Sequence, residues 1–231
     1  MNAVITGASR GLGAAVARAL SDRGWGVVLD ARGAADLEAV AAALGRSAVA
    51  VAGDVSDPAH RQALVAAARS LGGLDLVVNN ASVLGPSPQP ALADYPLDVL
   101  TTVYQVNVLA PLALTQLALP LLAASPLGAV IDVTSDAAVE GYEGWGGYGS
   151  SKAALEQLSN VLAAEHPDLH VYRFDPGDMR TQMHQEAFPG EDISDRPGPD
   201  DVAVPGLLRL IETLPPSGRY RASELTSKQT R

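Results

Sequence analysis

The stretch Thr6-Gly7-Ala8-Ser9-Arg10-Gly11-Leu12-Gly13 lies between an apolar run, Ala3–Thr6, and a segment of helical periodicity. Four apolar residues of that segment recur on one helical face: Leu12, Val16, Ala19 and Leu20. Glycines between a strand and a helix let the backbone turn tightly and approach a pyrophosphate, which rests on the helix N-terminus. A glycine-rich loop alone is also compatible with a plain tight turn, but its place between strand and helix favours a dinucleotide-binding loop.

Short apolar runs alternate with helical segments along the rest of the chain. The runs consist almost wholly of Val, Ile, Leu and Ala, as is typical of parallel strands covered on both faces. Glycines follow the first three helical segments as stop signals, and Asp57-Pro58 begins the third as N-cap and first turn. We therefore predict an α/β fold, a doubly wound Rossmann-like parallel sheet of about seven strands with helices on both faces, in a single domain, 1–231. The predicted strands are Ala3–Thr6, Val27–Asp30, Ala48–Gly53, Leu74–Asn79, Ala129–Thr134, Val171–Asp175 and a short one near Arg219–Arg221.

The composition excludes several classes of function. A chain of 231 residues permits one large domain, which can bury its core without a disulfide or a metal. Because there is no cysteine, thiolate nucleophiles and Cys-ligated metals are excluded. The formal charge of −10, from 16 Lys and Arg against 26 Asp and Glu, argues against nucleic-acid partners and anionic membranes. The N-terminus carries neither a basic region nor a long apolar stretch, so we expect a cytoplasmic protein.

One uncharged segment, 99–131, is long enough to cross a bilayer. It contains three prolines, and the acids Asp98 and Asp132 flank it in place of the basic residues that orient membrane helices. A long buried helix followed by a buried strand explains the segment better, so no membrane partner is expected.

The pentapeptide Tyr148-Gly149-Ser150-Ser151-Lys152 opens a predicted amphipathic helix that continues through Leu155, Leu158, Val161 and Leu162. Residues four apart share a helix face, so the Tyr148 and Lys152 side chains point into the same space. A free phenol has a pKa of about 10, and a nearby ammonium favours the phenolate and lowers that pKa toward the range useful for proton transfer. Tyr and Lys at this spacing also occur as an ordinary surface pair. The pattern therefore indicates a catalytic site only when other residues of such a site are present as well.

Further motifs stand at the ends of predicted strands, where doubly wound sheets bind ligands. Ser135 ends one strand, 13 residues before the tyrosine, and Asn79-Asn80-Ala81 closes another. Pro176-Gly177 follows the sixth strand, and Thr181 comes four residues after that glycine. Together with the glycine-rich loop, these motifs resemble the short-chain dehydrogenase/reductase family over residues 1 to 181, in order and in register.

This resemblance implies a hydride-transfer site with four catalytic residues. Ser135 would orient and polarise a substrate carbonyl while Tyr148 donates the proton. Lys152 would lower the pKa of the phenol and bind the nicotinamide ribose. Asn107 would hold a water beside the lysine, although a buried Asn that satisfies a helix backbone is the alternative. The chain departs from the family pattern at Ser82, where Gly is usual, at the acids Asp175 and Asp178 around Pro-Gly, and in its short C-terminal end.

The resemblance also implies a nicotinamide dinucleotide, and the second strand indicates which one. Ala31 stands where NAD-specific members carry an acid, and Arg32 stands where NADP-specific members carry a base. Arg32, assisted by Arg10, would hold a 2′-phosphate, whereas Asp30 pointing at the ribose would favour NAD. Asp54 resembles the family residue at the adenine edge, with helix capping as the alternative. We expect NADP(H), with NAD(H) as the alternative and no metal, bound by Gly7, Ser9, Arg10, Gly11, Leu12, Gly13, Arg32, Asp54, Val55, Asn80, Ala81, Tyr148, Lys152, Pro176, Gly177, Met179 and Thr181.

The expected activity is that of an NADP(H)-dependent carbonyl reductase or alcohol dehydrogenase acting on a small ketone, aldehyde or secondary alcohol. An NAD-dependent alcohol dehydrogenase is one alternative. A dinucleotide-responsive binding protein without turnover is another, although the presence of both Tyr148 and Lys152 disfavours it. His166 and His170 have helical spacing, but Pro167 separates them, so we interpret them as surface or structural residues.

The irregular segment 178–201 is predicted to form a lid over the substrate. It carries seven acids against two bases, which would repel acidic carrier proteins and coenzyme A thioesters and favour neutral or cationic substrates. A solvated charge run without a role is the alternative. Four residues, Tyr142, Trp145, Met183 and Phe188, either form an apolar pocket wall or pack structurally.

The segment Val99–Ala124 and the helix after Tyr148 carry more apolar surface than one sheet face needs. Because family members commonly pair these two helices across a two-fold axis, we expect a homodimer or a homotetramer.

Overall fold

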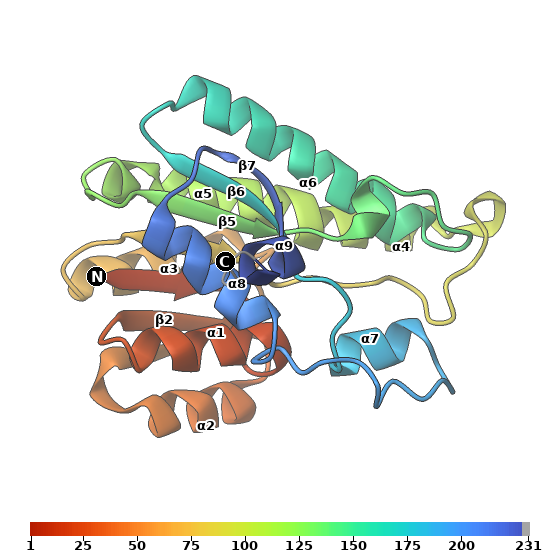
Figure 1. The fold of residues 1–231 in the computed structure, drawn as a ribbon, viewed down its shortest axis with the longest axis horizontal. Coiled ribbons are helices and arrows are strands. Elements are labelled where there is room, and N and C mark those ends of the chain that lie inside the picture. Colours follow the sequence, from red (N-terminus) through yellow and green to blue (C-terminus); the bar gives the residue numbers. More distant parts are fainter. Residues whose placement is uncertain (228–231) are drawn as a thin grey trace.

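Seven parallel strands form one sheet in the order β3-β2-β1-β4-β5-β6-β7 in the computed structural model, which describes residues 1–227 (Figure 1). The doubly wound fold is thereby confirmed, and each predicted strand lies within two residues of an observed one. The strands are β1 (Asn2–Ile5), β2 (Gly26–Ala31), β3 (Ala48–Ala52), β4 (Leu76–Asn79), β5 (Ala129–Val133), β6 (His170–Asp175) and β7 (Gly218–Arg221).

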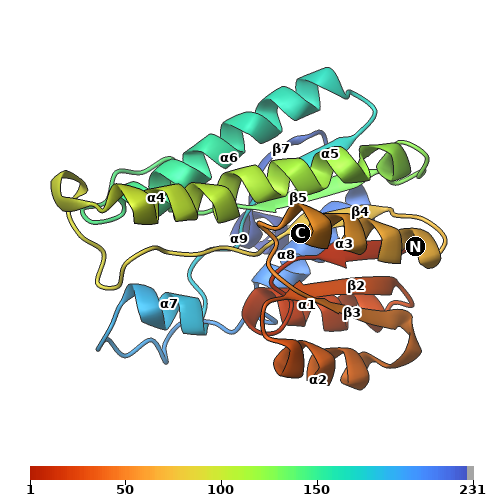
Figure 2. The ribbon, with the colours of Figure 1, turned by 180° about the vertical axis from the view of Figure 1, so that it is seen from behind.

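Helices cover both faces of the sheet. The face toward the viewer in Figure 1 carries α1 (Gly11–Ser21), α2 (Ala34–Leu44) and α8 (Ala203–Thr213). The face toward the viewer in Figure 2 carries α3 (Pro58–Ser70), α4 (Leu97–Tyr104), α5 (Ala110–Leu122) and α6 (Gly146–Glu165). The short helix α7 (Gln182–Ala187) stands apart from both layers, and α9 (Ala222–Thr226) follows β7. Single 3-10 turns lie at Gly45–Ser47, Leu92–Asp94 and Asp136–Ala138.

The helix ends follow the local signals in the sequence. The Asp57 carboxylate accepts a hydrogen bond from the Ala59 amide at 2.9 Å, so it caps α3, and Pro58 occupies the first turn. Gly45 ends α2 with a φ of 79°, a conformation that favours glycine. Farther along the chain, α6 ends at Glu165, just before His166 and Pro167.

The uncharged segment forms the expected long helix followed by a buried strand, β5. Its helical part runs from Leu97 to Leu122, and length and composition alone would allow it to cross a membrane. Within the domain this helix packs against α3 and α6, and Leu114 and Leu122 are fully buried in the core. The helix is not uniform, because Gln105–Leu109 forms a π-helical turn between α4 and α5.

Successive strand residues face opposite layers of the core. Ile5, Leu29 and Ile131 pack with α1 and α8, whereas Val4 and Val28 pack with α3 and α5. This alternation explains why the strands are apolar throughout, since both faces are covered. On α6 the expected apolar face is incomplete: Leu155 is buried, but Val161 is 44% exposed.

Candidate active site

The glycine-rich loop connects β1 to α1 at the carboxyl end of the sheet, and close backbone approaches fix it there. Gly7 has a φ of 64°, and a Cβ on it would lie 2.9 Å from the Ala81 Cα. A Cβ on Gly13 would lie 2.3 Å from the Gly7 carbonyl oxygen. The Thr6 hydroxyl accepts hydrogen bonds from the amides of Asn80 and Ala81 at 2.9 and 3.0 Å. The loop is therefore locked against the end of β4.

Asp30, at the end of β2, is turned away from solvent and toward this loop. One carboxylate oxygen lies 2.6 Å from His60 Nε2, and the other accepts a hydrogen bond from the Gly7 amide at 3.3 Å. Burial raises the pKa of Asp30, while the hydrogen bond from His60 opposes the rise. Both oxygens of Asp30 thus have protein partners, an arrangement that contrasts with the alternative in which Asp30 points at a ribose.

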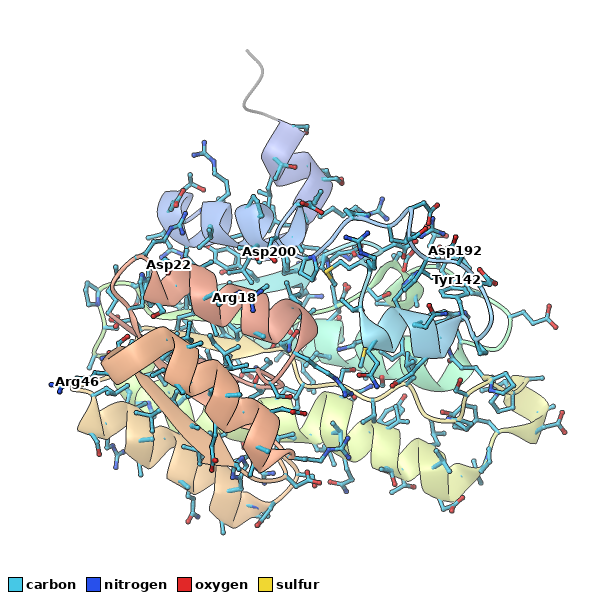
Figure 3. The ribbon with its side chains drawn as sticks, turned by 90° about the horizontal axis from the view of Figure 1, so that it is seen from below. Arg18, Asp22, Arg46, Tyr142, Asp192 and Asp200 are labelled. Atoms are coloured by element: carbon cyan, nitrogen blue, oxygen red, sulfur yellow. The ribbon has the colours of Figure 1, made fainter. Side chains whose placement is uncertain are left out.

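Basic side chains gather beyond the end of β2. Arg10 and Arg32 are exposed and line the same cavity. Arg18 of α1 forms an ion pair of 3.4 Å with Asp200, and both residues are labelled in Figure 3. Asp54 accepts hydrogen bonds from the amide and hydroxyl of Ser56, which lower its pKa. Since Asp57 caps α3, helix capping does not account for Asp54.

One cavity of about 1020 Å³ runs along the carboxyl ends of the strands. Its lining includes every residue expected to bind cofactor or substrate except Gly13, which lies beneath the loop, and Asn107, which is fully buried. A dinucleotide fits this cavity, because the closely packed loop offers backbone at one end and arginines stand near the end of β2. Gly7, Ser9, Gly11 and Leu12 would hold its pyrophosphate, and Pro176, Gly177, Met179 and Thr181 line the same cavity, with Thr181 beside Gly11.

Tyr148 and Lys152 share one face of α6, as their spacing predicts. The Lys152 ammonium lies 5.5 Å from the centroid of the Tyr148 ring and donates a hydrogen bond to the Val133 carbonyl at 2.8 Å. Both side chains are buried, with Lys152 only 2% exposed. Ser135 follows β5 directly and lines the same cavity. The structure therefore brings Ser135, Tyr148 and Lys152 together.

Burial dominates the titration of this pair. It lowers the pKa of Lys152 to about 8 and raises the pKa of Tyr148, with Asp175 and Asp136 adding to the latter rise. The Ser82 hydroxyl is buried without a hydrogen bond of good geometry, yet it lies near the phenol and opposes the rise. The expectation that Lys152 lowers the phenol pKa below its ordinary value is thus wrong for the cofactor-free protein. Desolvation of the phenol outweighs the effect of Ser82, and the phenol keeps its proton.

Asn107 lies in the π-helical turn and bridges the helix to the segment after β4. Its amide nitrogen donates to the Val83 carbonyl and the Ser151 hydroxyl, and its oxygen accepts from the Val83 amide, all at 2.9 to 3.0 Å. The side chain therefore positions the chain beside Ser82 and the start of α6. These contacts match the alternative interpretation of Asn107, a buried Asn whose side chain satisfies backbone groups.

A polar layer lies behind the site, and the sequence did not reveal it. Arg219 of β7 donates to Glu156 at 2.9 Å, to Asp175 at 3.0 Å and to the Ser135 carbonyl at 3.1 Å. Asp175 also accepts from the Gly177 amide at 3.0 Å, so this departure from the family pattern holds the Pro-Gly turn. The partners of Arg219 lie 44 to 84 positions away from it along the chain, so no local signal could have found this layer.

Aromatic and apolar side chains line the cavity beside Tyr148. The Trp145 ring lies 5.7 Å from Phe188 and 5.8 Å from Tyr148, measured between ring centroids. Tyr142, Met183 and Phe188 also line the cavity. All four residues expected as a pocket wall therefore lie there.

Comparisons with known proteins agree with this arrangement. The sequence profile described as short chain dehydrogenase matches residues 1–192. The chain is 37% identical over 189 residues to a serine 3-dehydrogenase of Agrobacterium fabrum, covering 78% of this chain and 72% of that protein. It is 32% identical over 221 residues to an (S)-benzoin-forming benzil reductase of Saccharomyces cerevisiae, covering 90% and 81%. Among solved structures, a short chain dehydrogenase from Shigella flexneri complexed with NADP superposes with a TM-score of 0.89 at 31% identity, covering 96% of each chain.

Proposed function

The chain belongs to the short-chain dehydrogenase family of oxidoreductases, and we propose that it is an NADP(H)-dependent carbonyl reductase or alcohol dehydrogenase. One observation carries this proposal: Ser135, Tyr148 and Lys152 line the same cavity as the glycine-rich loop. The substrate class is a small ketone, aldehyde or secondary alcohol that reaches Ser135 and Tyr148 together.

Each side chain of the site has its own role in the reduction. The Ser135 hydroxyl, which in the structure donates to Asp136, turns its one proton to the substrate carbonyl and polarises it. Tyr148, whose pKa burial raises, holds its proton until negative charge develops on the carbonyl oxygen and then transfers the proton there. Lys152 presents a buried ammonium to the phenol and the nicotinamide ribose, and Asn107 supports this end of the cavity. When bound, NADPH supplies the hydride.

Three observations favour NADP(H) over NAD(H). Arg10 and Arg32 are exposed at the cavity, where a guanidinium can bind a 2′-phosphate through charged hydrogen bonds. The Asp30 carboxylate, which would serve a ribose 2′-hydroxyl, instead bonds to His60 and Gly7. The Shigella flexneri structure that resembles this chain was also complexed with NADP.

Thermal shift and turnover together test the proposal. NADPH should raise the melting temperature more than NADH does at equal concentration, because the stabilisation grows with ln(1 + [L]/Kd). A panel of ketones and aldehydes should then consume NADPH, followed by its absorbance. Binding of NADPH without turnover of any substrate would support the dinucleotide-responsive binding protein, and a larger shift with NADH would support an NAD-dependent enzyme.

We also propose a homodimer or homotetramer in the cytoplasm. Leu97, Leu109 and Leu117 are exposed along the long helix, and Val161 is exposed on α6, so both helices carry apolar surface outward. Pairing of these surfaces across a two-fold axis would bury them. A monomer by light scattering at micromolar concentration would contradict the assembly, and cell fractionation checks the location.

Segment 178–201, which includes α7, is proposed as the substrate lid, since several of its residues line the cavity.

A further inference from the structure

Asp136 places a carboxylate directly beside the group that binds the substrate carbonyl. Its Oδ1 accepts a hydrogen bond from the Ser135 hydroxyl at 2.9 Å and another from the Ala137 amide at 2.8 Å. Its Oδ2 accepts from the Tyr142 hydroxyl at 3.1 Å, and this bond raises the pKa of Tyr142. Asp136 is half-buried and lines the cavity.

Within the part of the chain that the structure describes, the charge of Asp136 has no oppositely charged partner. Over residues 1–227, none of the ion pairs involves Asp136. Its neighbours in the cavity differ in this respect. Asp175 pairs with Arg219 and Arg221. Asp178, whose side chain is 60% exposed, lies 3.6 Å from Arg196 and 4.0 Å from His184. Only neutral donors hold the Asp136 carboxylate, so its negative charge acts on whatever occupies the cavity.

Aromatic rings line the same cavity as this carboxylate. Trp145 and Phe188 pack against each other, and Tyr142 bonds to Asp136 itself. The faces of aromatic rings attract cations, and a carboxylate beside them adds a full opposite charge. The combination is suited to an ammonium group and unsuited to an acid, since a second carboxylate near Asp136 would be repelled.

We propose that the substrate is an amino ketone or amino alcohol whose cationic nitrogen is bound by Asp136 among these rings. The nitrogen is attached to the carbon next to the reacting carbon, because the Ser135 hydroxyl and the Asp136 carboxylate lie within one hydrogen bond of each other. This inference rests on the proposed function, since it assigns a substrate class to the same site. It makes Asp136 a specificity-determining residue.

Two ketones of the same shape isolate the effect of charge. The first is (2-oxopropyl)trimethylammonium, and the second is 4,4-dimethylpentan-2-one, in which carbon replaces the quaternary nitrogen. With NADPH, the wild type should reduce the cation with a kcat/KM at least about tenfold higher, as expected for a close pair of opposite charges beside aromatic rings. In Asp136→Asn this ratio should fall below about threefold. Each ratio is measured within one variant, so any loss of active enzyme cancels.

Asp178→Asn is the matched control, because it removes the same charge from the same cavity at a carboxylate that already has partners. This variant should keep the preference for the cation. An equal loss of preference in both variants would mean that the overall negative potential selects the cation, and it would overturn the role of Asp136.

Calorimetric titration of each ketone into the NADP⁺ complex adds a readout without turnover. The cation should bind the wild type more tightly than its neutral counterpart does, and Asp136→Asn should remove the difference. Equal binding and equal reduction of the two ketones by the wild type would overturn this inference while leaving the reductase proposal intact. Failure of the protein to bind NADP⁺ or NADPH would instead overturn the proposed function itself.

Discussion

Asp30 and His60 form a buried pair, with Oδ1 and Nε2 2.6 Å apart, between the end of β2 and the first turn of α3. The pair is connected to the cofactor loop, because the second oxygen of Asp30 accepts from the Gly7 amide. His60 packs closely against the backbone at Gly53, where a Cβ would lie 2.3 Å from its Nδ1. The pair therefore joins β2, α3 and the loop.

Replacement of His60 with Ala should destabilise the protein strongly, because it leaves the Asp30 carboxylate buried without its partner. Loss of one member of a buried pair typically costs about 3–5 kcal/mol. Urea unfolding measures the change in the free energy of unfolding. His60→Gln, which keeps a hydrogen-bond donor, is the control and should lose less. A change below about 1 kcal/mol for His60→Ala would show that Asp30 does not depend on the pair.

Tyr148→Phe keeps the ring and removes only the hydroxyl. The fold and the binding of NADPH should survive, while turnover falls by about 10²–10⁴-fold, the usual contribution of a positioned general acid. Steady-state kinetics and cofactor fluorescence measure the two effects. If Tyr148 were an ordinary surface residue, the variant would turn over at a nearly normal rate, although burial of the side chain argues against that view.

The binding of NADPH to the free enzyme should weaken as the pH rises through about 8. The folded pKa of Lys152 is lowered to about 8, so its ammonium is present below that pH and is lost above it. Loss of the charge should weaken binding by about tenfold. Fluorescence titrations from pH 7 to 10 measure the dissociation constant. Lys152→Met should bind weakly at every pH and show no inflection near pH 8, and an unchanged inflection would assign it to another group.

The same lowered pKa affects stability. Between about pH 8 and the ordinary value of 10.5, the unfolded chain binds a proton that the folded chain does not, so the contribution of Lys152 to stability rises with pH in this window.

Arg32→Ala should discriminate between the two cofactors. If Arg32 holds the 2′-phosphate, its loss should raise the KM for NADPH by about 10- to 150-fold, equivalent to about 1.5–3 kcal/mol for a charged hydrogen bond. The KM for NADH should change little, since NADH lacks that phosphate. Arg46→Ala, in the turn after α2 and outside the cavity lining, is a control of equal charge. An equal rise in KM for both cofactors would mean that Arg32 contacts a part of the molecule that NADPH and NADH have in common.

Local signals explain which parts of this structure the sequence predicts. The strands are apolar because both faces are covered, and Asp57 and Gly45 mark helix ends through bonds to their immediate neighbours. Tyr148 and Lys152 share a face because they are four residues apart on one helix. His60 and Asp30 are 30 positions apart, and Arg219 and Glu156 are 63 apart, so only the folded sheet brings them together. The prediction that the Tyr148 pKa is lowered was wrong for a related reason. Burial of the phenol depends on the whole cavity, and the spacing of Tyr148 and Lys152 does not reveal it.

The π-helical turn Gln105–Leu109 sets the rotational phase of the helix that contains it. An α-helix advances by about 100° per residue, and a π turn accommodates about one residue more than an α turn. Asn107 and Val103 can therefore face the active-site segment while Leu114 and Leu122 still face the core on the far side of the turn. If the same residues were wound as a regular α-helix, one of these two faces would be misdirected by about 100°, whereas deletion of one residue would keep the flanking segments in phase. At this chain length, the wider turn is therefore what lets the bonds of Asn107 to Val83 coexist with the core packing of Leu114 and Leu122 in one continuous helix.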